Sequence, residues 1–237
     1  MSSPDVVYLC RPGDRNEELR HSLRSLQNVP HGRVHVAGYA PKWLSAGVAR
    51  IGVEQGPVKF RNTENNVLAA CDDPGVSDPF WMFNDDFFVM HPMEELPILN
   101  RGPLLEAYIH HSGLYGGTYT QAMEAAYRLL TRMGYKEPLS YDLHVPLLVY
   151  KEHMRKAISL RDRIRYHWRT VYGNLAELGG IRIQDVKIRN GDPYKRQEYR
   201  EWPLVSTSDA VFLYHSVGDY IRNTFHVQGP YEVPSKE

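Results

Sequence analysis

Two adjacent carboxylates in the first half of the chain stand between two strongly apolar runs. Asp85 and Asp86 follow residues 80–84 and precede residues 87–90. A run so rich in aromatic and branched side chains predicts a strand buried on both faces. Burying even one isolated charge costs several kcal/mol, so we expect the strand to end at Asn84 and the carboxylates to emerge at its carboxyl end. There they could bind a divalent cation and the charged group that accompanies it. An exposed Asn-Asp turn is the alternative.

A second pair of candidate ligands, Asp142 and His144, lies further along the chain. Their spacing places both side chains on one face of an extended segment, which suits a metal site. Imidazole would favour Mn²⁺ over Mg²⁺, whereas carboxylates alone suit either ion. Asp142 could instead be the general base that accepts the proton of an acceptor hydroxyl. For His144 the alternative is a partly buried, hydrogen-bonded histidine beside Pro146.

Polar residues also follow the first predicted strand, residues 5–10. Arg11 and Asp14 lie at the edge where a doubly wound sheet binds a nucleotide. Asp14 could accept hydrogen bonds from a ribose hydroxyl or a uracil, and Arg11 could face a phosphate. Arg61 precedes Thr63, the predicted N-cap of a helix, where open backbone amides favour anions. An ordinary turn and an ordinary N-cap are the alternatives.

These side chains need a fold that brings strand ends together. Short apolar runs predict strands over residues 5–10, 33–38, 49–53 and 80–84. Helical periodicity separates them over residues 16–26 and 64–71. This alternation predicts a doubly wound α/β sheet with its ligand site at the strand carboxyl ends.

The pattern changes beyond residue 103. Further helices are predicted over residues 121–133, 151–175 and 217–225, and further strands over residues 181–188 and 210–214. We therefore expect an α/β core over residues 1–150 that binds the nucleotide and the metal. A helical and basic acceptor-side region over residues 151–237 would complete the same domain.

The segment 151–169 carries seven basic residues interleaved with aromatic side chains. Cations on phosphates and rings stacked on bases can hold a nucleic-acid strand. Arg161, Arg163 and Arg165 are therefore candidates for acceptor binding. A solvated helix face with its aromatic side chains packed inward is the alternative.

Composition limits the classes of function. The 237 residues carry 28 basic and 28 acidic side chains, so no net charge indicates a nucleic-acid or membrane partner. The two cysteines, Cys10 and Cys71, lie in predicted core elements and make no disulfide framework, which suits a reducing cytosol. No signal-peptide pattern is present, and no apolar run approaches the roughly 20 residues that span a bilayer. We expect a cytoplasmic protein with no membrane partner.

Four blocks of the sequence carry a resemblance to known enzymes. In order along the chain they are residues 5–8 (DVVY), 18–26 (ELRHSLRSL), 41–44 (PKWL) and 83–88 (FNDDFF). This series resembles the first two conserved blocks of the Stealth-type sugar-phosphate transferases. It is equally similar to a set of small glycosyltransferases encoded by actinobacterial phages. Residues 141–146, 172–175 and 206–209 resemble later blocks of the phage-type group.

The resemblance implies the glycosyltransferase A-type fold, with a mixed, doubly wound sheet, a helical C-terminal appendage and an Asp-x-Asp-like metal motif. It also implies sugar transfer from a nucleotide sugar, a UDP-sugar first among the candidates. Mn²⁺ or Mg²⁺ would neutralise the leaving diphosphate and would need only one or two carboxylates besides the phosphates. Asp85, Asp86 and His144 would then be the metal ligands, and Asn84 and Asp85 would contact the donor.

The acceptor and the oligomeric state stay open. The candidate acceptors are a modified DNA base, a protein side chain and another sugar. The DNA base is a candidate because some phage-type members glycosylate modified DNA bases. A phage-encoded enzyme would work in the host cytoplasm. The alternatives are a Stealth-like sugar-phosphate transferase acting on a glycan, a binding module of the same fold without turnover, and a nucleic-acid-binding module without catalysis.

Overall fold

The computed structural model describes residues 3–13, 15–114, 116–160, 167–192 and 198–234. The chain packs into two compact units that alternate along the sequence. Unit 1 comprises Met1–Leu96, His144–Leu148 and Val186–Glu237, and unit 2 comprises Pro97–Leu143 and Val149–Asp185. The expectation that residues 1–150 serve the donor and residues 151–237 the acceptor concerns function, and it stays a prediction.

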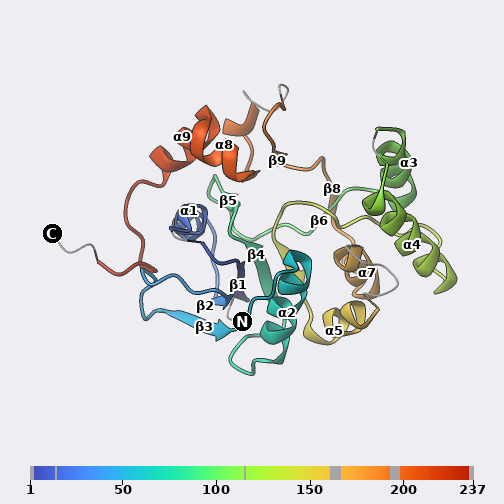
Figure 1. The fold of residues 1–237 in the computed structure, drawn as a ribbon, viewed down its shortest axis with the longest axis horizontal. Coiled ribbons are helices and arrows are strands. Elements are labelled where there is room, and N and C mark those ends of the chain that lie inside the picture. The colour runs from blue at the N-terminus through green and yellow to red at the C-terminus, as the bar shows by residue number, and fades with distance from the viewer. Residues whose placement is uncertain (1–2, 14, 115, 161–166, 193–197, 235–237) are drawn as a thin grey trace. The chain divides into compact units, whose positions relative to one another are not determined.

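A five-stranded sheet with the order β3-β2-β1-β4-β7 forms the centre of unit 1 (Figure 1). Its strands are β1 (Asp5–Cys10), β2 (Val34–Gly38), β3 (Val48–Gly52), β4 (Phe80–Asn84) and β7 (Leu147–Val149). Strands β2 and β4 pair with β1 in parallel, and β3 pairs with β2 in parallel. Every residue of β1 is buried, as expected for a central parallel strand. Because β1, β2, β3 and β4 run in one direction, their carboxyl ends meet at one edge.

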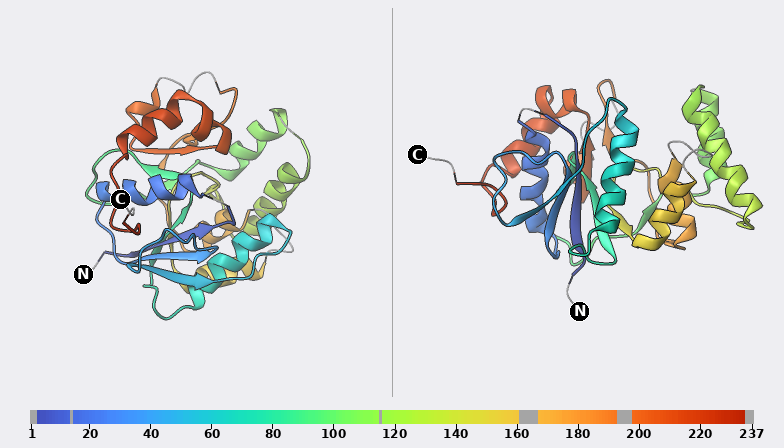
Figure 2. Two further views of the ribbon diagram at one scale, coloured as in Figure 1. Left: turned by 60° about the vertical axis from the view of Figure 1, so that its left-hand side comes forward. Right: turned by 60° about the horizontal axis from the view of Figure 1, so that its bottom comes forward.

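Two helices cover opposite faces of this sheet (Figure 2). Helix α1 (Glu17–Ser25) buries Leu19 and Leu23 and continues into a short 3₁₀ turn, Leu26–Asn28. Helix α2 (Lys59–Asp72) packs against β1, β2 and β3. Cys10 and Cys71 are both buried free thiols.

The start of α2 corrects one prediction. The helix begins at Lys59 with Val58 at the N-cap, so Thr63 is an interior residue whose hydroxyl donates to the Lys59 carbonyl. The side chain of Asn62 exchanges two hydrogen bonds with the backbone of Gly56, at 2.8 and 2.9 Å, which fixes the chain before the first turn. Arg61 therefore lies inside the helix and does not precede it.

A second, three-stranded sheet of unit 1 has the order β5-β10-β9. Its strands are β5 (Phe87–Val89), β9 (Lys187–Ile188) and β10 (Leu204–Thr207). Strand β10 is antiparallel to β5 and parallel to β9. A 3₁₀ turn, Glu198–Arg200, and two helices, α8 (Asp209–Tyr214) and α9 (Ser216–Thr224), complete this region. Phe88 of β5 stacks on Phe212 of α8 with ring centroids 5.8 Å apart, and both are fully buried.

Two predicted strands are corrected here. Residues 210–214 form helix α8, because a short apolar run does not distinguish a helix from a strand. Burial shows the difference: Phe212 is buried, whereas its neighbours Leu213 and Tyr214 are 49% and 80% exposed. Residues 181–188 form two short strands in different sheets: β8 (Ile181–Arg182) pairs with β6 (Leu99–Asn100), and β9 pairs with β10. The predicted helix over residues 217–225 is confirmed as α9.

Unit 2 is mostly helical. Its elements are β6 (Leu99–Asn100), α3 (Leu104–Leu114), α4 (Thr118–Arg132), α5 (Lys151–Ser159), α7 (Trp168–Leu175) and β8. Helix α7 packs against both α4 and α5. The helix predicted over residues 121–133 is confirmed as α4. Helices α5 and α7 both lie within the predicted helical region 151–175, of which residues 161–166 are outside the described part of the chain. None of the helices in the described ranges is both long enough and apolar enough to cross a membrane.

Candidate active site

The predicted carboxylate pair lies at a strand end, as expected. Strand β4 ends at Asn84, and Asp85 and Asp86 form the turn that leads into β5. Leu9 of β1 is in register with Asn84, which places Arg11 beside this turn. The Arg11 Nε atom is 3.6 Å from Asp85 Oδ2. Both aspartate side chains are only 15% exposed, so this is not an open surface turn.

Two further carboxylates approach the same arginine. Glu18 comes from the first turn of α1, and its Oε2 is 3.6 Å from Arg11 Nη2. Asp209 comes from the first turn of α8, and its Oδ1 accepts a hydrogen bond of 2.7 Å from the same nitrogen. We call Glu18, Asp85, Asp86 and Asp209 the carboxylate cluster. Arg11 thus contacts carboxylates from three separate elements.

A buried lysine holds the remaining member of the cluster. Lys187 of β9 is 11% exposed, and its ammonium donates to Asp86 Oδ2 and to the backbone carbonyl of Thr207. The other oxygen of this carboxylate, Asp86 Oδ1, is buried and has no hydrogen-bond partner among the described residues. One side of the Asp86 carboxylate is therefore satisfied and the other is not.

The cluster has more negative than positive charge. Within the described part of the chain, two cations, Arg11 and Lys187, make direct ion pairs with four carboxylates. Burial, and then the charge of Asp86, raises the pKa of Asp85. Burial, and then the charges of Asp85, Asp86 and Asp209, raises the pKa of Glu18 to about 8. Both carboxyls therefore keep their protons to a higher pH than usual, and a further cation beside them would be stabilising.

Asp209 shows the opposite behaviour. Its partial burial acts to raise its pKa, but the hydrogen bond and the charge of Arg11 outweigh this and hold the pKa below the ordinary value. Asp209 is 64% exposed. The shortage of positive charge is therefore concentrated on the buried members of the cluster.

These residues fit a divalent cation bound together with a phosphate ligand. Asp85 and Asp86 supply hard oxygen atoms, and Asp86 Oδ1 lacks a partner among the described residues. Over the described ranges, no group of three or more His, Cys, Asp or Glu side chains could hold a metal ion. Mg²⁺ usually binds through only one or two carboxylates together with waters and substrate phosphates, so two carboxylates meet its needs. His144 is half-buried in unit 1, and its assignment as a ligand stays a prediction.

The other predicted site residues either make other contacts or lie outside the described residues. Arg61 Nη1 is 3.2 Å from Glu64 Oε2, so its guanidinium is engaged within α2. Asp142 belongs to unit 2, where its Oδ2 is 4.0 Å from His167 Nδ1. Asp14, Arg161, Arg163 and Arg165 lie outside the described residues. Their roles in donor and acceptor binding stay predictions.

The sequence did not indicate Glu18 or Lys187 as site residues. Glu18 lies on an amphipathic helix, where an acidic residue in the first turn is ordinary. Lys187 lies in a segment that alternates as a surface strand would. A usable signal was the position of Glu18 within the block 18–26 that carries the family resemblance. Asp209 falls in another such block, residues 206–209.

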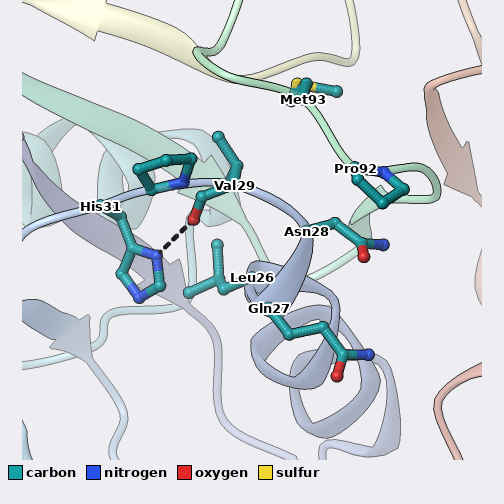
Figure 3. A pocket seen from close by; sticks show the side chains of 8 residues that line it. Leu26, Gln27, Asn28, Val29, His31, Pro92 and Met93 are labelled. Atoms are coloured by element: carbon teal, nitrogen blue, oxygen red, sulfur yellow. Dashed lines mark hydrogen bonds between the residues drawn. The ribbon is translucent and has the colours of Figure 1, made fainter.

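A pocket of about 500 Å³ lies elsewhere in unit 1. Figure 3 shows its lining, in which His31 Nδ1 is 2.8 Å from the Val29 carbonyl. Its residues are Leu26, Gln27, Asn28, Val29, Pro30, His31, Pro92 and Met93. The segment 26–31 leads into the amino end of β2, whereas Asp85 follows the carboxyl end of β4. Since both strands are parallel to β1, the pocket lies at the opposite edge of the sheet from the carboxylate cluster.

Comparisons with known proteins bear on the fold. No family model matches the chain, and no curated protein sequence matches it. Among solved structures, the chain is similar to the galactosyltransferase LgtC, crystallised in complex with donor and acceptor sugar analogues. The match has a TM-score of 0.51 and 12% sequence identity, and it covers 97% of each chain. The protein therefore has the glycosyltransferase A-type fold, which confirms the predicted fold class. Its relation to phage-type or Stealth-type enzymes stays a prediction.

Proposed function

We propose that the protein is a metal-dependent glycosyltransferase that moves a sugar from a nucleotide sugar to an acceptor hydroxyl. One observation carries this proposal. A carboxylate cluster short of positive charge lies at the carboxyl ends of parallel strands, the edge where open α/β sheets bind ligands. The likeness in fold to a galactosyltransferase supports it.

Electrostatics links the cluster to the donor. A nucleotide diphosphate and the carboxylate cluster are both anionic, so a cation must lie between them for the donor to bind. Asp85 and Asp86 would hold Mn²⁺ or Mg²⁺, and the bound ion would neutralise the charge that develops on the leaving diphosphate. Arg11 is 41% exposed and can turn part of its guanidinium to a phosphate. Asn84, at the end of β4, would orient the two aspartates or contact the ribose.

The acceptor reaction needs a base. The hydroxyl oxygen forms a bond to the anomeric carbon, and the bond from that carbon to the diphosphate oxygen breaks, so the electron pair leaves with the diphosphate. We assign Asp142 as the carboxylate that takes the hydroxyl proton. The candidate acceptors are a hydroxymethylated DNA base, a protein side chain and another sugar. Transfer of a sugar phosphate is the competing reaction.

Calorimetry of donor binding tests the proposal. UDP-galactose and UDP-glucose are titrated into the full chain with Mn²⁺ and again with EDTA. We expect binding that depends on Mn²⁺, and at least about a tenfold weaker affinity in the double variant Asp85→Asn, Asp86→Asn. The matched control is Asp72→Asn, Asp73→Asn, a second adjacent acidic pair that lies at the end of α2.

The control should bind like the wild type, and circular dichroism should show that all variants are folded. Unchanged donor affinity in the Asp85, Asp86 variant would refute the site. Mass spectrometry of DNA, protein and glycan from cells that express the chain would then identify the acceptor by the added hexose mass.

A further inference from the structure

A buried histidine in unit 2 lacks hydrogen-bond partners. His167 directly precedes α7 and is fully buried. Neither of its ring nitrogens has a hydrogen-bond partner among the residues that the structure describes. Buried polar side chains in native proteins are nearly always hydrogen-bonded to protein or to ordered water. Such a group indicates that a water molecule or a ligand atom completes the site.

The nearest charged group identifies where that atom would lie. Asp142 Oδ2 is 4.0 Å from His167 Nδ1, which is too long for a direct hydrogen bond. One oxygen atom about 2.8 Å from each would bridge the two groups. The Asp142 side chain is 23% exposed, so a ligand can reach this carboxylate from solvent.

Aromatic rings lie close to His167. The ring centroid of Tyr119 is 4.6 Å from that of His167 and 4.8 Å from that of His111. Tyr119 and His111 are both half-buried, and His111 Nδ1 is 2.9 Å from Thr120 Oγ1. Rings beside a few converging polar groups are typical of sites for small ligands that have an apolar face and hydroxyl groups.

The charges select a neutral ligand. Asp142 repels an anion. Burial, with smaller contributions from His111 and Arg101 and against the opposing charge of Asp142, lowers the pKa of His167. The neutral imidazole has one donor and one acceptor nitrogen, which matches a hydroxyl group.

We propose that unit 2 carries a binding site for a neutral sugar, in which a sugar hydroxyl bridges His167 and Asp142 beside the rings of Tyr119 and His111. His167 and Asp142 are the hydroxyl-binding residues, and Tyr119 supplies the ring that the sugar contacts. The identification of this hydroxyl as that of the acceptor rests on the proposed function; the binding site itself does not.

Imidazole NMR of the full chain tests the site directly. The neutral probes are methyl β-galactoside, methyl α-glucoside and glycerol, and galactose 6-phosphate is the anionic comparison. We expect at least one neutral probe to shift the His167 ring signals in a saturable way, and the phosphate to bind at least about tenfold more weakly. The signals are assigned with His167→Phe.

Three variants separate the site from a general effect. Asp142→Asn and Tyr119→Ala change half-buried residues and should each weaken the probe about tenfold while the fold is retained. The control His110→Phe changes an exposed neighbour of His111 and should leave the affinity unchanged. Loss of affinity in both Asp142→Asn and Tyr119→Ala, with the control unaffected, supports the site even if His167→Phe fails to fold.

A null result would overturn the inference. If no neutral probe shifts the His167 signals, or if Asp142→Asn binds the probe as well as the wild type, the gap holds water only. Titration of UDP-galactose with Mn²⁺ into the same samples keeps the two proposals apart. Donor binding without sugar binding at His167 refutes this inference alone, and the reverse result refutes the proposed function.

Discussion

Replacing Glu18 by glutamine should stabilise the protein at alkaline pH, because it removes one negative charge from the carboxylate cluster. Glu18 is 11% exposed. Burial, and then the charges of Asp85, Asp86 and Asp209, raises the pKa of its carboxyl from the ordinary 4.5 to about 8. Glutamine keeps the size of the side chain and resembles its protonated form.

The sign of the effect follows from proton binding. At pH values below about 4.5 the carboxyl is protonated in both the native and the unfolded state, so it adds no pH-dependent penalty. Between pH 4.5 and about 8 the unfolded state ionises first, and the wild type loses stability as the pH rises. The loss is complete above about pH 8. A change in pKa of this size sets an upper limit of roughly 5 kcal/mol, and relaxation of the site reduces the expected value to about 2 kcal/mol.

Urea unfolding measures this difference. The wild type and Glu18→Gln are compared at about pH 5 and about pH 9 in EDTA. Glu18→Gln should gain about 2 kcal/mol relative to the wild type between the two conditions. The control Glu17→Gln changes a more exposed carboxylate of the same helical turn, which lies 3.5 Å from Arg20, and should gain little. Saturating Mn²⁺ should reduce the gain, because the ion supplies the missing positive charge. The same pH dependence in both proteins would show that the cluster is not short of positive charge.

Two substitutions, one of them with a matched control, test other parts of the packing. Lys187→Met leaves Asp86 without its direct ion pair in a buried site and should cost about 3 kcal/mol in urea unfolding; a loss below about 1 kcal/mol would mean that the pair is solvated. Gly173→Ala places a Cβ atom 2.3 Å from the ring of Tyr141 and should destabilise the protein by about 2 kcal/mol in thermal unfolding. Gly113→Ala, where the added atom meets nothing within 4 Å, should be neutral or stabilising by up to about 1 kcal/mol. Equal effects of the two glycine substitutions would contradict the packing at Tyr141.

The end of β4 could be predicted from the sequence because its cause is local. A run of buried aromatic residues cannot continue into two adjacent carboxylates without a large desolvation penalty. The strand ends at Asn84, as this reasoning requires. The same reasoning places Arg11 at the neighbouring strand end, because a parallel sheet brings its carboxyl ends to one edge.

The rest of the cluster could not be predicted, because it depends on distant contacts. Lys187 and Asp86 are 101 residues apart in the sequence, and no local pattern distinguishes a lysine that pairs with a buried aspartate from one on a solvated strand. Glu18 reads as an ordinary residue of a helix first turn. The strand prediction for residues 210–214 was wrong for another reason. The run is short enough to suit either period, and Phe212 packs against Phe88, a distant residue that the local pattern does not reveal.

The two cations that pair with the carboxylate cluster, Arg11 and Lys187, differ in how readily they can leave their partners. Lys187 is 11% exposed and pairs with Asp86, which is 15% exposed, so separating them would leave buried charges at a cost of several kcal/mol. Arg11 is 41% exposed and pairs most closely with Asp209, which is 64% exposed, and a pair of this kind contributes about 1 kcal/mol or less. A cation on the open oxygen of Asp86 would not need to displace Lys187. Under the proposed function, Arg11 would therefore be the group that leaves its carboxylates for a phosphate, whereas Lys187 would stay paired with Asp86.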